Sequence, residues 1–200
     1  MAYRNGDAKS MIHHRAIWKA VDEYRLQSLL DPNLNVVVSA ERIDLTDSSR
    51  LEALLESVEA KLQRIGISDR AVIAVKNIIL ELAGNVLLHG TGSRDREELL
   101  VVSLYDGAVR LWMFGHGRPS QIDRLYRVIN SIYEIAKPPG HREALLRKRN
   151  EELYRMSSSP ANAELGGGAG MLTIAALSRE PIWMLKSKVH DNSFALSSVV

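Results

Sequence analysis

Three polar residues recur at every fourth position of one predicted helix: Glu81, Asn85 and His89. A helix advances about 100° per residue, so these side chains follow one narrow strip. The strip runs beside an apolar stripe that should face the core, made of Val72, Val75, Ile79, Leu82 and Val86. A cleft at the edge of a core can hold a carboxylate and an amide against a ligand without burying either completely. The alternative is an ordinary polar helix surface, because such triples also arise by chance.

A glycine-rich run lies directly before a short predicted helix and contains Gly166, Gly167, Gly168 and Gly170. Successive glycines let backbone N–H groups converge on an anion, and a helix N-terminus adds partial positive charge. The run therefore favours phosphate as its ligand, although a hinge or a plain linker would have a similar composition. No Lys-Ser or Lys-Thr pair follows it at the P-loop spacing, which excludes a P-loop.

Other kinds of site have little support in the sequence. Gly115 and Gly117 lack the third glycine of a dinucleotide-binding fingerprint, and the histidines lack a zinc-binding spacing. The 200 residues include no cysteine, which excludes disulfides and thiolate sites. A net charge of only +2, with acidic residues among the basic ones, argues against a nucleic-acid partner. Without a secretory signal or a membrane-spanning apolar run, we expect a cytoplasmic protein with no membrane partner.

Periodicity, capping residues and turn residues outline one domain over residues 15–200, preceded by a flexible arm at 1–14. Helices are predicted near 15–30, 47–64, 69–89, 119–135, 142–156 and 171–178. Strands are predicted near 35–40, 98–105, 109–114, 182–188 and 193–200, and Asp106-Gly107 should join two of them in a hairpin. This order predicts an α+β fold, a two-layer sandwich in which helices cover one face of a mixed sheet.

Three segments taken in chain order resemble the boxes of a nucleotide-binding superfamily. ELAGNVLLHG at 81–90, MFGHG at 113–117 and GGGAGML at 166–172 resemble the N, G1 and G2 boxes of the GHKL superfamily. The first box looks most like that of the anti-sigma-factor serine kinases. The whole layout, from about residue 15 to 200, looks like the SiaB family of bacterial protein kinases.

The resemblance implies a Bergerat-type fold with a site for ATP and Mg²⁺. It assigns Asn85 to the metal and makes Glu81 the general base that orients or deprotonates the attacking hydroxyl. Gly166 to Gly170 would form a lid over the phosphates, and His89, Gly115 and Gly117 would complete the nucleotide site. The implied activity is that of a serine/threonine kinase acting on a small STAS-like protein in a partner-switching pathway. The resemblance is compatible with a homodimer.

The sequence departs from the superfamily pattern at three places. Met113-Phe114 precede Gly115 where typical members carry an aspartate that reads adenine, Leu88 replaces a frequent lysine, and Met171-Leu172 replace a leucine-glycine pair. These departures keep a second hypothesis open: a non-catalytic protein that sequesters its partner with weak or no nucleotide use. A histidine kinase or an ATP-driven machine would need a further domain, for which one layer pair leaves no room.

Overall fold

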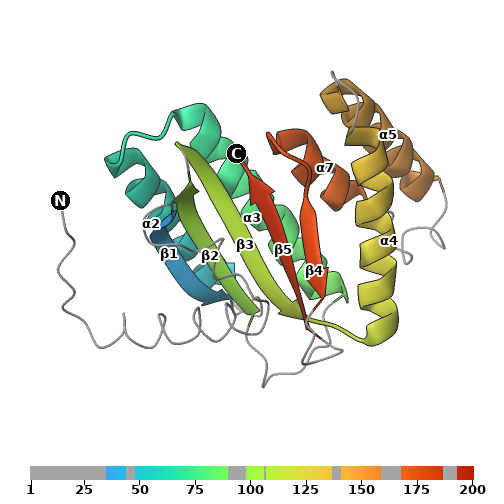
Figure 1. The fold of residues 1–200 in the computed structure, drawn as a ribbon, viewed down its shortest axis with the longest axis horizontal. Helices are drawn as coiled ribbons and strands as arrows, with labels where there is room; N and C mark the ends of the chain where they lie inside the picture. The colour runs from blue at the N-terminus through green and yellow to red at the C-terminus, as the bar shows by residue number, and fades with distance from the viewer. Residues whose placement is uncertain are drawn as a thin grey trace.

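The computed structural model describes residues 35–43, 48–89, 98–105, 107–136, 141–158, 168–186 and 193–200. The predicted arm at 1–14 and helix at 15–30 lie outside these ranges, and the single-domain boundaries remain a prediction. The elements that are described appear in Figure 1, where helices lie behind and beside one sheet. None of the described helices is long and apolar enough to cross a membrane.

One five-stranded sheet runs through the fold, with the strand order β1-β2-β3-β5-β4. Its strands are β1 (Asn35–Ile43), β2 (Glu98–Tyr105), β3 (Ala108–His116), β4 (Trp183–Lys186) and β5 (Ser193–Val199). All the described pairings are antiparallel, so the expectation of a mixed sheet was wrong. The reason lies in the strand order: β3 and β4 run in the same direction, but β5 lies between them and pairs with both.

The helices begin and end close to where the sequence predicts. They are α2 (Ser48–Arg64), α3 (Asp69–His89), α4 (Pro119–Ala136), α5 (His141–Ser157) and α7 (Ala169–Leu177). Ser68 caps α3 as expected, because its Oγ accepts the backbone N–H of Ala71 at 3.4 Å. Gly107 supplies the predicted hairpin turn with φ of 73°, and the flanking Tyr105 and Ala108 pair with each other.

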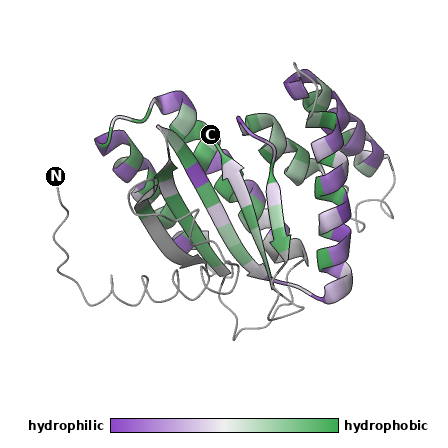
Figure 2. Cartoon of the chain, in the orientation of Figure 1, coloured by the Kyte–Doolittle hydropathy of each residue, from purple (hydrophilic) through white to green (hydrophobic). Residues whose placement is uncertain are grey.

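The core lies between the sheet and the helices. From α3 it takes the predicted apolar stripe, of which Val72, Val75, Ile79 and Leu82 are all buried, and the side chain of Val86 lies outside the description. Alternate residues of the central strands meet them, including Leu100, Val102, Leu111, Met113 and Leu196. Figure 2 shows the complementary pattern, with hydrophilic residues over much of α4 and α5.

The short helix α7 is apolar on nearly all sides, which predicts a helix surrounded by protein. It contacts α3, α4 and α5, and its buried residues include Met171, Leu172 and Ile174. A segment that follows a glycine run in the sequence is thus held by three helices from earlier parts of the chain. The opposite face of the sheet also has a buried centre, where Trp112 stacks on Phe114 with ring centroids 6.2 Å apart.

Candidate functional site

The polar strip of α3 is fixed by a hydrogen bond within the helix. Asn85 Nδ2 donates to the backbone oxygen of Glu81 at 2.8 Å, and both residues are half-buried. Because only the nitrogen of an amide can donate, this bond defines which way the Asn85 amide faces. The Oδ1 atom of Asn85 and the carboxylate of Glu81 therefore present oxygen ligands beside one another.

The glycine-rich run ends in a turn that only glycine adopts easily. Gly168 has φ of 73° and ψ of 7°, the left-handed conformation, and precedes the first turn of α7. Its carbonyl accepts the backbone N–H of Leu172 at 3.0 Å. A Cβ atom on Gly168 would also lie 3.2 Å from Val128 Cγ1 of α4. This glycine is thus required both by its backbone conformation and by a close neighbour.

The two features come together at Gly170. A Cβ atom placed on Gly170 would lie 2.7 Å from Glu81 Oε2, 3.0 Å from Asn85 Nδ2 and 3.5 Å from Asn85 Oδ1. The first turn of α7 therefore packs directly onto the carboxylate and the amide of α3. A carboxylate beside a helix N-terminus is electrostatically favourable, because the unpaired N–H groups there carry partial positive charge.

Met171 completes the contact between α3 and α7. Its sulfur accepts a weak hydrogen bond from Asn85 Nδ2 at 3.9 Å, and the residue is buried. Met171, one of the two residues at which the sequence departs from the superfamily pattern after the glycine run, thus places a polarizable side chain in contact with Asn85. The sequence drew attention to this departure but gave no sign that Met171 would touch the polar strip.

The MFGHG segment is packed differently from the other two. Gly115 and Gly117 lie at the end of β3, where a Cβ on Gly115 would be 2.8 Å from Phe194 Cζ. A Cβ on Gly117 would be 3.2 Å from Ile122 Cγ1 and 3.9 Å from Phe194 Cε1. Phe194 of β5, which pairs with Gly115, is buried. Its ring therefore fills the space that opens above both glycines, and sequence reasoning missed this residue.

We expect Gly115→Ala to lower the free energy of unfolding by about 1–3 kcal/mol, because the added methyl group overpacks the buried ring of Phe194. Phe194→Leu in the same chain should recover part of the loss, which chemical denaturation would measure. Gly84→Ala is the matched control, since a Cβ at Gly84 in α3 meets no atom of the described residues within 4 Å. It should stabilise by up to about 1 kcal/mol. Equal stability of Gly115→Ala and the parent would contradict the packing role.

Some of the other predicted site residues lie outside the part of the chain that the structure describes. Gly166 and Gly167 belong to the segment before residue 168, and His89 ends α3 with a side chain that is likewise outside it. Of the nine predicted site residues, the structure brings Glu81, Asn85 and Gly170 into one contact. Gly168 directly precedes that contact, at the start of α7.

The ligand atoms at the contact between α3 and α7 suit Mg²⁺ rather than a metal ion held by protein side chains alone. Among the described residues no group of three or more His, Cys, Asp or Glu could hold a metal by itself. Mg²⁺ does not need such a cage, because it commonly binds through one or two protein oxygens together with phosphate oxygens and water. The Oδ1 oxygen of Asn85, beside the Glu81 carboxylate, fits that requirement. Within the described contact no thiolate or imidazole competes, and the thioether of Met171 is a soft ligand that Mg²⁺ does not favour.

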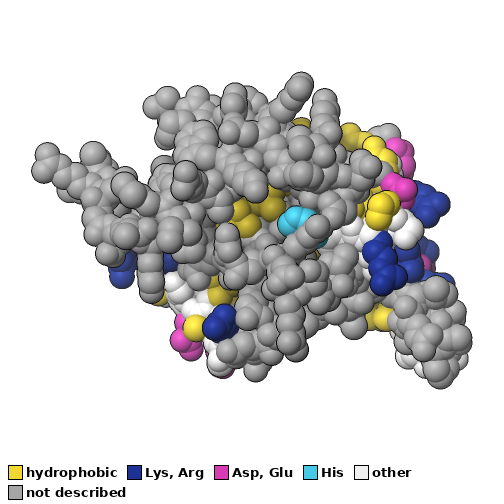
Figure 3. All heavy atoms as spheres, turned by 90° about the horizontal axis from the view of Figure 1, so that it is seen from below, with side chains coloured by type: hydrophobic (Ala, Val, Ile, Leu, Met, Phe, Trp, Pro, Cys, Tyr) yellow, Lys and Arg dark blue, Asp and Glu magenta, His cyan; other side chains and the backbone are white. Residues whose placement is uncertain are grey.

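The charged helix α5 is largely paired within itself. Lys148 lies 3.3 Å from Glu151 and 3.7 Å from Glu152, and Arg155 lies 2.7 Å from Glu152. Figure 3 likewise shows basic and acidic side chains interspersed on one side of the molecule. Such mixed charges do not form the single-sign surface that nucleic-acid binding requires.

Comparison with known proteins supports the fold. No protein-family profile matches the sequence, and no curated protein matches it. A solved structure does: a chain in the crystal structure of the SiaB-SiaC complex from Pseudomonas aeruginosa aligns with a TM-score of 0.67. The alignment covers 96% of this chain and 100% of that chain at 16% sequence identity. The expected likeness to SiaB proteins is thus supported in the architecture, since an identity this low establishes the fold alone.

Proposed function

We propose that this protein binds Mg-ATP between α3 and α7 and transfers its γ-phosphoryl group to a hydroxyl of a small STAS-like partner protein. One observation carries the proposal: Glu81 and Asn85 meet the glycine-led first turn of α7 at Gly170. Phosphoryl transfer demands positioning and charge neutralisation rather than a covalent protein intermediate. A carboxylate, an amide oxygen and free helix N–H groups in one place supply these functions.

Each residue has a distinct role in the proposed reaction. The partner's hydroxyl oxygen forms a bond to the γ-phosphorus as the bond to the β–γ bridging oxygen breaks, and ADP leaves. Glu81 accepts the hydroxyl proton, and Asn85 offers Oδ1 to the metal because its Nδ2 is engaged by the backbone of Glu81. The metal ion, when bound, neutralises charge on the phosphate oxygens. The amides at the start of α7 hold the phosphates.

The close contact at Gly170 has a consequence for binding. Glu81 Oε2 already occupies the space beside Gly170, so a metal and a phosphate can enter only if α7 and the carboxylate separate. The carboxylate also repels a phosphate at the same helix end unless a cation lies between them. Nucleotide binding should therefore depend strongly on magnesium.

Thermal unfolding with nucleotide tests the proposal. At about 100 times the dissociation constant, Mg-ATP should add roughly 2.7 kcal/mol to the free energy of unfolding. Removing magnesium with EDTA should abolish most of that gain, and Asn85→Ala should bind ATP without the magnesium enhancement. Parallel titrations with ADP, GTP and inorganic triphosphate separate recognition of the base from recognition of the phosphates. No stabilisation by millimolar Mg-ATP would refute nucleotide binding.

The second candidate is a non-catalytic protein that sequesters its partner. It is favoured by one observation, the ring of Phe194 packed over Gly115 and Gly117 in a segment that lacks an adenine-reading acid. The crystal structure with the similar fold is that of a complex of two proteins, so assembly with a partner fits either candidate. Mixing the protein with SiaC and, separately, with STAS-like proteins, with and without Mg-ATP, distinguishes the two candidates. A stable complex without nucleotide and without labelled product would favour sequestration.

A further inference from the structure

Arg149 of α5 makes an unusual set of contacts for a half-buried cation. Its Nε donates to Thr173 Oγ1 of α7 at 2.7 Å, and its Nη1 lies 3.5 Å from Asn150 Oδ1. Within the described residues no carboxylate pairs with it, because Glu152, one turn further along α5, is engaged with Arg155 and Lys148. The Arg149 guanidinium is therefore hydrogen-bonded to α7 through the neutral hydroxyl group of Thr173.

The Thr173 hydroxyl group connects Arg149 to the start of α7. Thr173 Oγ1 accepts from Arg149 and donates to the backbone oxygen of Ala169 at 3.0 Å. Ala169 is the first residue of α7 and precedes Gly170, against which Glu81 packs. A chain of hydrogen bonds thus runs from α5 to the turn of α7 that faces the polar strip. Hydrogen bonds in such a chain polarise and strengthen one another.

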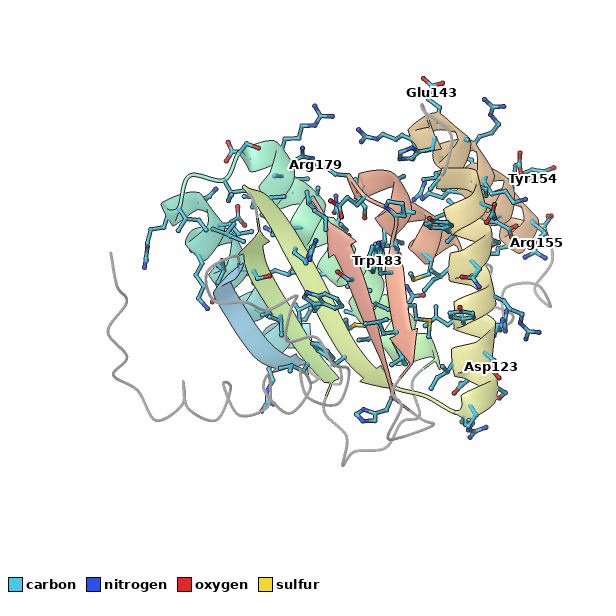
Figure 4. The ribbon with its side chains drawn as sticks, in the orientation of Figure 1. Asp123, Glu143, Tyr154, Arg155, Arg179 and Trp183 are labelled. Carbon is cyan, nitrogen blue, oxygen red and sulfur yellow. The ribbon has the colours of Figure 1, made fainter. Side chains whose placement is uncertain are left out.

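We infer that Arg149 is a positioning residue for the phosphate end of the proposed nucleotide site. Through Thr173 it fixes the first turn of α7, and with it the direction in which the amides of Ala169 and Gly170 point. The inference rests on the proposed function, which assigns those amides to the phosphates. The opposite side of α5 is available for other roles, since Tyr154 and Arg155 project away from the sheet in Figure 4.

Arg149→Met removes the donor while retaining much of the side-chain volume, and Thr173→Val removes the hydroxyl with little change of shape. Each should raise the dissociation constants of Mg-ATP and of inorganic triphosphate roughly tenfold, the size expected for one hydrogen bond to a charged group. The double variant should bind no worse than either single one, because both break the same chain of contacts. Arg149→Lys should recover part of the affinity. Arg147→Met, on the exposed side of the same helix, is the control and should bind like the parent.

Isothermal calorimetry with both probes, together with amide hydrogen exchange of residues 170–172, tests the inference. Unchanged affinity in Arg149→Met, or additive losses in the double variant, would overturn it. If the parent binds neither probe, the proposed function fails by itself. Hydrogen exchange then decides whether Arg149 orders α7, because it needs no nucleotide. Faster exchange in Arg149→Met than in Arg147→Met supports that ordering, and equal exchange rejects it.

Discussion

Glu81→Gln should bind Mg-ATP almost as well as the parent and yet lose phosphoryl transfer by about 10²–10⁴-fold, the usual contribution of a general base. The amide has nearly the same shape as the carboxylate and can still lie against Gly170, so the contact between α3 and α7 should survive. The glutamine amide, however, cannot accept the hydroxyl proton. Transfer of ³²P from labelled ATP to SiaC or to a STAS-like protein measures the rate, and calorimetry measures the affinity.

For the same substitution we expect a gain in affinity, rather than a loss, when ATP binds without metal. In the parent, the Glu81 carboxylate lies against the first turn of α7, where the proposed site would receive a phosphate of the same charge. Removing the charge should tighten the binding of metal-free ATP while transfer is lost. Glu52→Gln, an exposed position of α2, is the control and should change neither quantity. Transfer at the parental rate in Glu81→Gln would show that Glu81 is not the base.

The sequence predicts the local structure of this protein well, because the signals for it are local. Ser68 caps α3, and Gly107 turns the hairpin where a turn dipeptide stands in the sequence. Strand order is a different matter. The order β1-β2-β3-β5-β4 places the last strand between two earlier ones, and no nearby residue encodes that insertion. The prediction of a mixed sheet was therefore wrong, although every strand lies near its predicted place in the sequence.

The same distinction applies to the candidate site. Helical spacing and a glycine run indicate Glu81, Asn85 and Gly170 separately, but only the tertiary structure shows them in contact. Phe194 lies opposite Gly115 because of the exact register between β3 and β5, and a slip of one residue would turn its ring to the other face. Such a register depends on the packing of the whole sheet, so the sequence alone could not reveal this neighbour.

Gly170→Ala should leave the protein folded and nearly as stable as the parent while it weakens Mg-ATP binding at least tenfold. The new methyl group would lie 2.7 Å from Glu81 Oε2 and 3.0 Å from Asn85 Nδ2, the ends of two half-buried side chains, of which the more crowded carboxylate can move aside at low cost. Replacing glycine by alanine within a helix also stabilises by up to about 1 kcal/mol, which offsets that cost. The unfolding free energy should therefore change by less than about 1 kcal/mol.

Function should respond far more strongly, since the methyl group takes the space between the carboxylate and the helix end where the proposed site would hold metal and phosphate. A displacement of about 1 Å in a catalytic group can cost roughly 10²-fold in rate, so transfer should fall further than binding. Denaturation, calorimetry and ³²P transfer on the same preparation compare the three effects. Gly84→Ala gives the stability gain of alanine in α3, at a position where the described part of the chain puts no atom close to the added methyl group. If Gly170→Ala bound and transferred like the parent, the contact between Glu81 and α7 would be packing alone, and the site would lie elsewhere.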